Sequence, residues 1–332
     1  MSRVPVLVTG GAGYIGSHAV LALKDAGWPV AVIDDLSNGS SELVPDDVPF
    51  FQGNVADRGL VQRIFEDQAI GAIMHFAGSI VVPESVEKPL KYYANNTLAS
   101  HALVSAAVDA GVNHILFSST AAVYGAPERV PVAEEDATFP INPYGASKLM
   151  TERMLDDASA AHGFNYGALR YFNVAGADPR GRAGQIGKGS THLIKIAVEA
   201  AVGKRDGVSV FGTDYPTPDG TCIRDYIHVS DLAAVHVAAL ERLVANPNEN
   251  IILNCGYGKG LSVIEVLDAV DRANGAAVPR EIAARRPGDP PQLVAGNKRL
   301  METLDWRPEH ADIDTIVADA LAWERTLAGR SP

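Results

Sequence analysis

The sequence predicts an α/β fold, in which a doubly wound parallel sheet is followed by a smaller α/β domain. The first observation is that short apolar segments alternate with segments of helical periodicity; the apolar segments lie at residues 4–8, 30–33, 50–55, 72–78 and 114–120. When strand and helix alternate in this way, the strands lie parallel and helices cover both faces of the sheet. The second observation is that this regularity ends near residue 173, and a stretch rich in glycine and charge follows from Gly176.

Composition limits the possible classes of function. The chain has 332 residues, 47% of them hydrophobic, and a net charge of −12, which argues against a broad nucleic-acid surface. No apolar run reaches about 20 residues and nothing resembles a signal peptide, so we expect no membrane span. Cys222 and Cys255 lack Cys-x-x-Cys spacing, which argues against a metal site or a disulfide framework and fits a cytoplasmic location.

A glycine-rich loop follows the first apolar segment. Gly10, Gly13 and Gly16 lie between Val8 and a helical pattern that starts near Ser17. Glycines at this spacing let the backbone approach a pyrophosphate, and the N-terminus of the helix faces the phosphates. The spacing alone is weak evidence, but strand, loop and helix stand here in the required order. The motif predicts a Rossmann-type dinucleotide site; the alternative is an ordinary glycine-rich turn.

Asp34 ends the second predicted strand, downstream of the glycine loop. A carboxylate at this place accepts hydrogen bonds from the adenine ribose hydroxyls and repels a 2′-phosphate. No arginine follows Asp34 closely. The sequence therefore favours NAD over NADP as the cofactor, and the alternative is a surface aspartate.

Further candidates for cofactor contacts follow the next strands. Asn54, after the third strand, either lies beside the adenine or closes a turn. The fourth strand ends in small residues at positions 77 and 78, which suits close approach of a cofactor. A helix is predicted from about residue 89 to 110, and it contains Asn95 and Asn96, one of which faces either the cofactor or solvent.

The fifth predicted strand ends in three hydroxyl residues, Ser118, Ser119 and Thr120. A parallel sheet presents groups to a ligand at the carboxyl ends of its strands. Thr120 could therefore hydrogen-bond a substrate hydroxyl; the alternative is that these residues only cap the strand.

Tyr144 and Lys148 stand at the start of a predicted helix. Asn142 is a good N-cap and Pro143 suits the first helical position, so the tyrosine and the lysine, four residues apart, share one face. A free tyrosine has a pKa near ~10, and a neighbouring ammonium favours the phenolate and lowers that pKa. Acid–base catalysis needs a pKa near the working pH, so this pair is a candidate proton carrier. The alternative is an amphipathic helix with a surface lysine.

The change of pattern divides the chain into two predicted domains. We expect a dinucleotide-binding domain over residues 1–173 and a substrate domain over residues 174–332. In the second domain a strand is predicted at residues 251–254, and the basic turn at residues 285–289 could meet phosphate. The sequence leaves open whether residues 229–244, a predicted helix, return to pack on the first sheet.

Four separated signals agree with one known family. They are the glycine loop, the Ser-Ser-Thr strand end, the Tyr144/Lys148 pair and the segment 224–231. Together they resemble the extended short-chain dehydrogenase/reductase family, and within it the chain is similar to the UDP-glucose 4-epimerases over nearly its whole length. Residues 210–221, Val-Phe-Gly-Thr-Asp-Tyr-Pro-Thr-Pro-Asp-Gly-Thr, are a specific marker of that group.

The resemblance implies reversible epimerisation of UDP-glucose and UDP-galactose at C4 through a transient 4-keto sugar, with NAD tightly bound and not consumed. Tyr144 would take the proton of the sugar 4-hydroxyl and return it. Lys148 would hold a cofactor ribose and, with the nicotinamide charge, lower the pKa of Tyr144, while Thr120 would ease the proton transfer. The resemblance also implies a homodimer, formed through the helices that start near Pro89 and Tyr144.

The site residues that follow from these motifs and from the resemblance form two sets. Cofactor contacts are expected at Gly10, Gly13, Tyr14, Ile15, Gly16, Asp34, Asn38, Asn54, Val55, Phe76, Ala77, Gly78, Asn95, Ser118, Tyr144, Lys148 and Tyr171. UDP-sugar contacts are expected at Thr120, Tyr144, Asn173, His192, Leu193, Ser209, Phe211, Arg224, Arg286 and Asp289. The resemblance gives the diphosphate to Arg224 and Arg286 and the uridine ribose to Asp289.

The chain departs from the family pattern at four positions. Ile80 stands where some members have a lysine, Asn54 where an aspartate is common, and His192 where an asparagine is frequent. Leu293 aligns with a position that limits room for an N-acetyl group in some members, and it is smaller than the tyrosine often found there. UDP-N-acetylglucosamine and UDP-xylose therefore stay open as substrates.

Two other functions are compatible with the fold. A 4,6-dehydratase needs an extra acid–base pair, commonly Asp-Glu just after the Ser/Thr, and here Ala121 and Ala122 follow Thr120. A non-catalytic NAD-sensing module usually lacks the Tyr/Lys pair, which this chain retains. The sequence therefore disfavours both.

Overall fold

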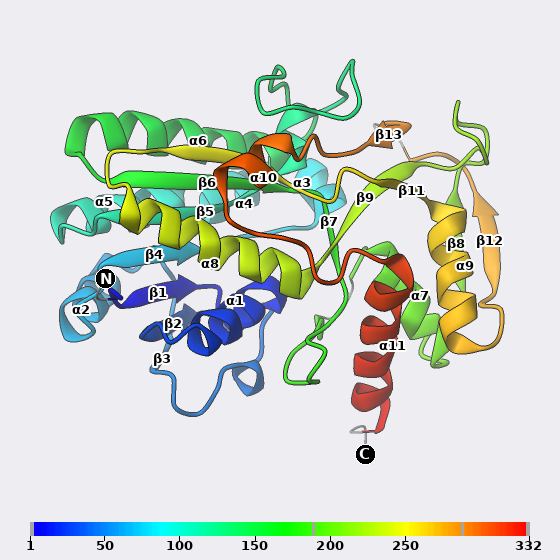
Figure 1. Ribbon diagram of the computed structural model, residues 1–332, viewed down its shortest axis with the longest axis horizontal. Helices are drawn as coiled ribbons and strands as arrows, with labels where there is room; N and C mark the ends of the chain where they lie inside the picture. The colour runs from blue at the N-terminus through cyan, green and yellow to red at the C-terminus, as the bar shows by residue number, and fades with distance from the viewer. Residues whose placement is uncertain (1–2, 188–189, 287–288, 330–332) are drawn as a thin grey trace.

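The structure is a computed structural model that describes residues 3–187, 190–286 and 289–329. Its larger part is a sheet of seven parallel strands with helices on both faces, and its smaller part, on the right in Figure 1, combines short strands with three helices. The predicted fold class, a Rossmann-type doubly wound sheet with a smaller α/β unit, is confirmed.

The strand order of the large sheet is that of a doubly wound fold. From one edge to the other, the sheet consists of β10 (Ile251–Cys255), β6 (Asn165–Tyr171), β5 (His114–Thr120), β4 (Ala72–His75), β1 (Val6–Thr9), β2 (Val30–Asp34) and β3 (Phe50–Gln52). Every neighbouring pair is parallel. The order reverses between β1 and β4, and such sheets bind ligands at the carboxyl ends of the strands beside this reversal.

Two helical layers cover the sheet because successive side chains of a strand point to opposite faces. One layer consists of α1 (Tyr14–Asp25) and α8 (Val229–Ala245); the other consists of α2 (Arg58–Asp67), α5 (Ala99–Asp109) and α6 (Pro143–His162). On β1, Val6 and Val8 pack in the core under the first layer, whereas Leu7 packs in the core under the second. Burial on both faces explains why the strands are continuous apolar runs in the sequence.

Two elements from the second half of the chain belong to this larger part. β10 extends the sheet beyond β6, with Ile251 opposite Gly167, and α8 packs against α1, β5 and β6. The strand predicted at residues 251–254 was expected in the second domain, and the structure corrects this expectation. Parallel pairing joins strands that are distant in sequence, so the apolar run alone does not reveal its partner.

The smaller part is organised around β9 (Ile223–His228). Its strands are β7 (Asn173–Ala175), β11 (Gly260–Ser262) and β13 (Gln292–Leu293), all paired with β9, and the separate pair β8 (Val208–Phe211) and β12 (Arg280–Ala283). Its helices are α7 (Leu193–Ala201), α9 (Val263–Asn274) and α11 (Ile313–Gly329), which share one apolar core. The short helix α10 (Lys298–Thr303) returns to β10.

Asp225 on β9 fastens the smaller part together. Its fully buried carboxylate accepts backbone hydrogen bonds from Tyr257 (3.0 Å), Gly258 (2.9 Å) and Ala295 (3.1 Å). Burial raises its pKa to about 6, and the three N–H donors act in the opposite direction. The bond to Ala295 holds the segment that contains β13 beside β9.

The helix predicted from residue 89 to 110 is interrupted. The structure has α3 (Val82–Glu87), α4 (Pro89–Tyr92), a π-helical segment η2 (Tyr93–Leu98) and then α5. Short 3₁₀ turns elsewhere in the described ranges include η1 (Ser41–Leu43) and η3 (Ala121–Tyr124). A π-helical turn shifts the side chains that follow it and occurs frequently at functional sites. Asn95 and Asn96 both lie in this segment.

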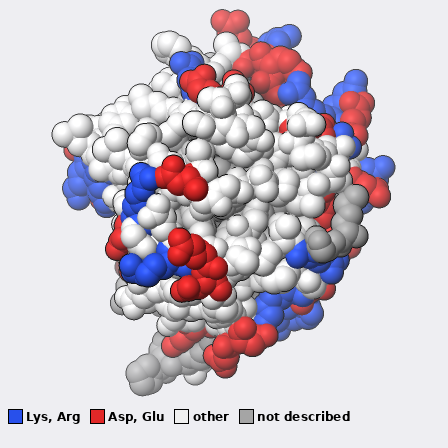
Figure 2. All heavy atoms as spheres, turned by 90° about the vertical axis from the view of Figure 1, so that its left-hand side faces the viewer, with Lys and Arg blue, Asp and Glu red and all other residues white. Residues whose placement is uncertain are grey.

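The surface gives two further observations. None of the helices in the described ranges has the length and apolar composition needed to cross a lipid bilayer. Figure 2 shows one face of the molecule, on which charged side chains of both signs lie around a broad uncharged area. Because basic and acidic groups are interspersed on this face, it presents no continuous basic surface to a polyanion.

Candidate active site

The glycine loop lies between β1 and α1, at the carboxyl ends of the strands. A side chain at Gly16 would come within 2.1 Å of the Gly10 carbonyl oxygen, and one at Gly10, whose φ is +70°, within 2.7 Å of Ala77 N. The loop therefore packs closely on both α1 and the end of β4. Because backbone rather than side chains forms this edge and α1 begins at Tyr14, the loop fits the pyrophosphate of a dinucleotide.

Asp34 lies where the ribose-binding carboxylate is expected. It ends β2, and its carboxylate accepts hydrogen bonds from Ala12 N (3.0 Å) and Leu36 N (2.8 Å). Burial raises the pKa of Asp34, whereas these two N–H donors lower it. The carboxylate is thus fixed beside the glycine loop, a position that fits an adenine ribose.

Other predicted cofactor residues are engaged with the protein itself. Asn54 closes a turn, since its Oδ1 accepts a hydrogen bond from Ala56 N (2.8 Å). Tyr14 donates its hydroxyl to Gly176 O (2.7 Å). Among the other residues expected to contact the cofactor, Val55 is buried, Ile15 and Phe76 are half-buried, and Asn38 is exposed.

The π-helical segment turns Asn96, rather than Asn95, into the interior. Asn96 is 2% exposed; its side-chain amide bonds to both backbone groups of Ser79 (2.7 and 3.0 Å) and donates to Ser147 Oγ (3.0 Å). Asn95 is exposed and donates to Ser79 Oγ (3.1 Å). The structure therefore places Asn96 against the residue that precedes Lys148, while the predicted contact, Asn95, lies at the surface.

Helix α6 begins as the sequence predicts. Asn142 is the N-cap, with its Oδ1 accepting a backbone N–H, and Pro143 is the first helical residue. Lys148 is buried and donates to Ser118 O (2.8 Å). Burial lowers the pKa of the Lys148 ammonium to about 8. The helix thus fixes Tyr144, one turn before Lys148, at the end of β5.

Two groups act on the Tyr144 phenol in opposite directions. Burial raises the pKa of Tyr144, and the side chain of neighbouring Thr120 lowers it. Lys148 was expected to lower the pKa of Tyr144, but its ammonium is directed to the Ser118 carbonyl. The protein groups therefore keep Tyr144 protonated at neutral pH, and a further cation near the phenol is needed to make it a base.

A buried polar network supports this arrangement, and sequence reasoning missed its two charged members. Glu152 on α6 accepts hydrogen bonds from Arg170 Nε (2.9 Å) and Nη2 (2.6 Å) and from the Ser119 hydroxyl. Ser118 bonds to Tyr171 through their hydroxyl groups. Because these contacts join β5, β6 and α6, they fix the strand end relative to the helix. The signal in the sequence was an arginine at the end of an apolar strand, since such a charge needs a partner.

Four of the predicted UDP-sugar residues meet in the smaller part. Arg224 on β9 donates to Asp289 Oδ1 (2.9 Å). The guanidinium carbon of Arg286 lies 4.0 Å from the centroid of the Phe211 ring. Two guanidinium groups suit phosphate oxygens, and one carboxylate suits hydroxyl donors, so this cluster can meet the parts of a nucleotide.

Asn173 adds to this cluster, because it opens β7 and is paired with Tyr226 on β9. Burial raises the pKa of Tyr226 to about 12, and the charge of Arg224 and then the side chain of Asn173 act against it. The other predicted members are Ser209, exposed on β8, and His192 and Leu193 at the start of α7. Burial lowers the pKa of His192, so its ring is neutral at neutral pH.

Comparison with known proteins decides the family. The model of the NAD dependent epimerase/dehydratase family matches residues 6–256. The chain belongs to this family. A UDP-glucose 4-epimerase of Azospirillum brasilense is 59% identical over 322 residues, which cover 97% of this chain and 92% of that protein.

Solved structures of epimerases agree with this assignment. The UDP-glucose 4-epimerase of Stenotrophomonas maltophila, with bound NAD and formylated UDP-arabinopyranose, has a TM-score of 0.96 and 38% identity, covering 99% of this chain and 100% of that one. The enzyme of Brucella ovis, in complex with NAD, has a TM-score of 0.93 and 43% identity, covering 97% and 98%. The resemblance to UDP-glucose 4-epimerases and the prediction of NAD are thereby confirmed.

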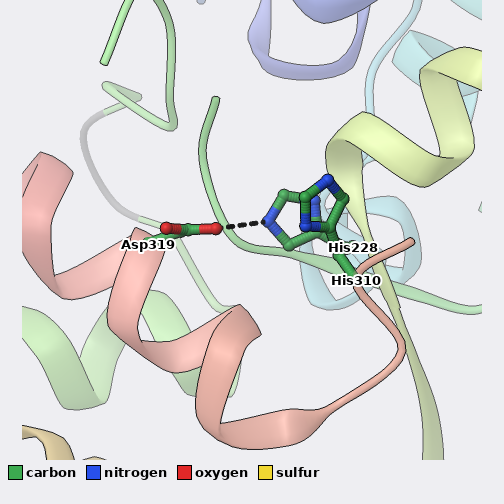
Figure 3. A group of neighbouring side chains, drawn as sticks. All are labelled: His228, His310 and Asp319. Carbon is green, nitrogen blue, oxygen red and sulfur yellow. Dashed lines mark hydrogen bonds and ion pairs between the residues drawn. The ribbon is translucent and has the colours of Figure 1, made fainter. Parts of the chain in front are cut away.

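A side-chain cluster outside the epimerase site has the composition of a metal site (Figure 3). His228, His310 and Asp319 place possible ligand atoms within 4.8 Å of one another. However, His228 Nδ1 accepts a hydrogen bond from Ser230 N (3.0 Å), so Nε2 carries the hydrogen and donates it to Asp319 Oδ2 (3.2 Å). A metal-bound histidine needs a free lone pair on one nitrogen and a hydrogen on the other. The cluster therefore fits an anchor between the end of β9 and α11 better than a set of metal ligands.

The two asparagines of η2 give a matched test. Replacing Asn96 by Ala leaves the backbone groups of Ser79 without their buried partners, so we expect a loss of about 2–4 kcal/mol in the free energy of unfolding. Asn95→Ala removes one exposed contact, and we expect a loss below about 1 kcal/mol. Urea denaturation of both variants measures the difference. Equal losses would show that Asn96 is not the buried member of the pair.

Proposed function

We propose that this chain interconverts UDP-glucose and UDP-galactose by epimerisation at C4, with NAD retained through the reaction. The observation that carries the proposal is the buried Lys148 ammonium, bound to the Ser118 carbonyl (2.8 Å) at the end of β5, one helical turn after Tyr144, whose pKa burial raises and the neighbouring Thr120 side chain lowers. The glycine loop and Asp34 lie on the same edge of the sheet, where they fit the pyrophosphate and the adenine ribose. Membership of the epimerase family supports the same reaction.

The catalytic residues divide the work of moving one proton. When bound, NAD supplies the group that accepts hydride from C4 of the sugar and returns it to the other face. Tyr144 takes the proton of the 4-hydroxyl and gives it back after the keto sugar has turned. Thr120, whose side chain lowers the pKa of Tyr144, eases the proton transfer. Lys148 holds the cofactor ribose, and the nicotinamide charge opposes the rise that burial causes in the pKa of Tyr144.

The nucleotide is held in the smaller part, away from the reacting carbon. Arg224 and Arg286 pair with the diphosphate, Asp289 accepts from the uridine ribose, and Asn173 holds the phosphate side of the substrate. Anchoring UDP in this way leaves the sugar free to turn between the two hydride transfers. Only these local arginine contacts hold the diphosphate, so a chain of net charge −12 can bind an anionic substrate.

A second candidate is a 4-epimerase of another UDP-sugar. Leu293 on β13 packs beside a small apolar cluster formed by Val123, Tyr124, Val132 and Leu149. A leucine at this place leaves more room than a tyrosine, which favours an N-acetylated or pentose sugar as an additional substrate. Ile80 is exposed after β4, so the lysine contact of some relatives is replaced by another group or lost.

We propose that the domains divide at residue 173 in chain order, with NAD on the first and the UDP-sugar on the second. Support comes from Tyr171 at the end of β6 and Asn173 at the start of β7, which belong to different sheets. α8 and β10 are the parts of the second half that join the first unit. Both cysteines are free and buried, which supports a cytoplasmic location.

We also propose a homodimer formed through α4, η2 and α6. Large apolar side chains are exposed on these neighbouring elements, including Leu90 (80% exposed), Leu98 (65%) and Met150 (46%). Contiguous exposed apolar residues on a monomer indicate a surface that another molecule covers. The same helices carry Tyr144 and Asn96, so the dimer would stabilise the elements of the active site.

Tyr144→Phe tests the role of the phenol. The variant keeps the aromatic ring and loses only the hydroxyl, so we expect turnover of UDP-galactose to fall by about a hundredfold to ten-thousandfold while NAD stays bound. A coupled assay measures turnover, and absorbance of the extracted cofactor measures NAD. Normal turnover in this variant would remove Tyr144 from the mechanism.

Leu90→Glu tests the dimer. A charge on this exposed apolar surface should shift the mass measured by light scattering from twice the 35.1 kDa chain toward a single chain at micromolar protein. Ile282→Glu, at another exposed apolar residue on β12, is the matched control and should stay dimeric. A wild-type protein that is already monomeric, or a variant that stays dimeric, would contradict the proposed interface.

A further inference from the structure

Arg224 and Asp289 bind each other in the substrate cluster. Arg224 Nη2 lies 2.9 Å from Asp289 Oδ1, and the two side chains are 12% and 34% exposed. The other guanidinium end is also engaged, because Nη1 donates to the Ile223 carbonyl (2.8 Å). The inference rests on the proposed function, in which Arg224 meets the diphosphate and Asp289 meets the ribose.

The phosphate and the ribose of a ligand therefore each compete with the Arg224–Asp289 ion pair. A phosphate that recruits Nη2 of Arg224 takes the cation away from Asp289 and leaves two anions side by side. A ribose that donates both hydroxyls to Asp289 replaces the cation as its partner. A ligand that carries both groups satisfies both side chains at once, whereas a ligand with one group leaves the other side chain without its partner.

We propose that the Arg224–Asp289 pair makes binding of the phosphates conditional on binding of the ribose. The site is thereby specific for nucleoside diphosphates and rejects inorganic pyrophosphate and phosphate. A site rejects a ligand strongly when that ligand leaves polar groups of the site without hydrogen-bond partners, because each lost bond lowers the affinity. Arg286 lies over the Phe211 ring, so its attraction for phosphate does not depend on this exchange.

The geometry suits this role for two reasons. The pair is partly buried, so its charges interact more strongly than those of a fully exposed pair. The pair also joins two segments that are distant in sequence, because Arg224 lies on β9 and Asp289 precedes β13. A separate contact holds β13 in place: the backbone of Ala295, just after β13, donates to Asp225 on β9. Release of Asp289 from Arg224 can thus occur without loss of the β9–β13 pairing.

The variant Asp289→Asn separates the two effects because it removes the charge and keeps the shape. We expect inorganic pyrophosphate to bind about tenfold more tightly to the variant, since Arg224 is no longer held by a carboxylate. We expect UDP to bind about tenfold more weakly, since the ribose loses its charged acceptor. The result specific to this proposal is that the affinities for pyrophosphate and for UDP change in opposite directions.

Isothermal titration of the purified full chain with UDP and with inorganic pyrophosphate, at constant salt and with a chelator present, measures both affinities. Asp268→Asn is the matched control: it also removes one carboxylate that pairs with an arginine in the smaller part, but at an exposed position of α9. We expect it to change both affinities by less than about twofold, because exposed charges are screened by salt.

Three outcomes would overturn the inference. If Asp289→Asn tightens both ligands, Asp289 acts only as a repelling charge and does not meet the ribose. If Asp289→Asn weakens the binding of both UDP and pyrophosphate, or changes neither affinity, the Arg224–Asp289 ion pair persists when ligand is bound and serves to position Arg224. If wild-type protein binds no UDP, the proposed function fails first, and that failure is recognised without any variant.

Discussion

The contact on which the rest of the site depends is the buried ammonium of Lys148 bound to the carbonyl of Ser118. Burial of a charged amine is costly, and here the carbonyl and the face of the Phe117 ring, 4.9 Å away, offset part of that cost. The remaining cost is visible in the lowered pKa of Lys148, about 8. In return, helix α6 is fixed to the end of β5, and Tyr144 meets Thr120.

The grip on the nucleotide is connected to this centre through continuous strands. β6 ends at Tyr171 and β7 begins at Asn173, so a single residue separates the sheet that carries the chemistry from the sheet that carries Arg224. Tyr171 bonds to Ser118, and Asn173 is paired with Tyr226 of β9. The distance between the proton carrier and the phosphate contacts is therefore set by paired backbone rather than by loops, which suits a substrate that must turn while one end stays fixed.

Local patterns in the sequence were enough to predict part of this structure. The glycine loop, Asp34, the N-cap at Asn142 and the Tyr144/Lys148 face each depend on a few neighbouring residues. The partner of β10, the π-helical turn that selects Asn96 and the Glu152–Arg170 pair depend on contacts between distant segments. The direction of the pKa of Tyr144 also could not be predicted, because burial is a property of the folded molecule.

The most direct test of the account is a proton NMR spectrum of the anomeric region after the purified protein is mixed with UDP-galactose and no cofactor. The account predicts conversion to a mixture with UDP-glucose, which would establish epimerisation and retention of NAD together. Unchanged UDP-galactose, both without NAD and with NAD supplied, would contradict the proposed reaction.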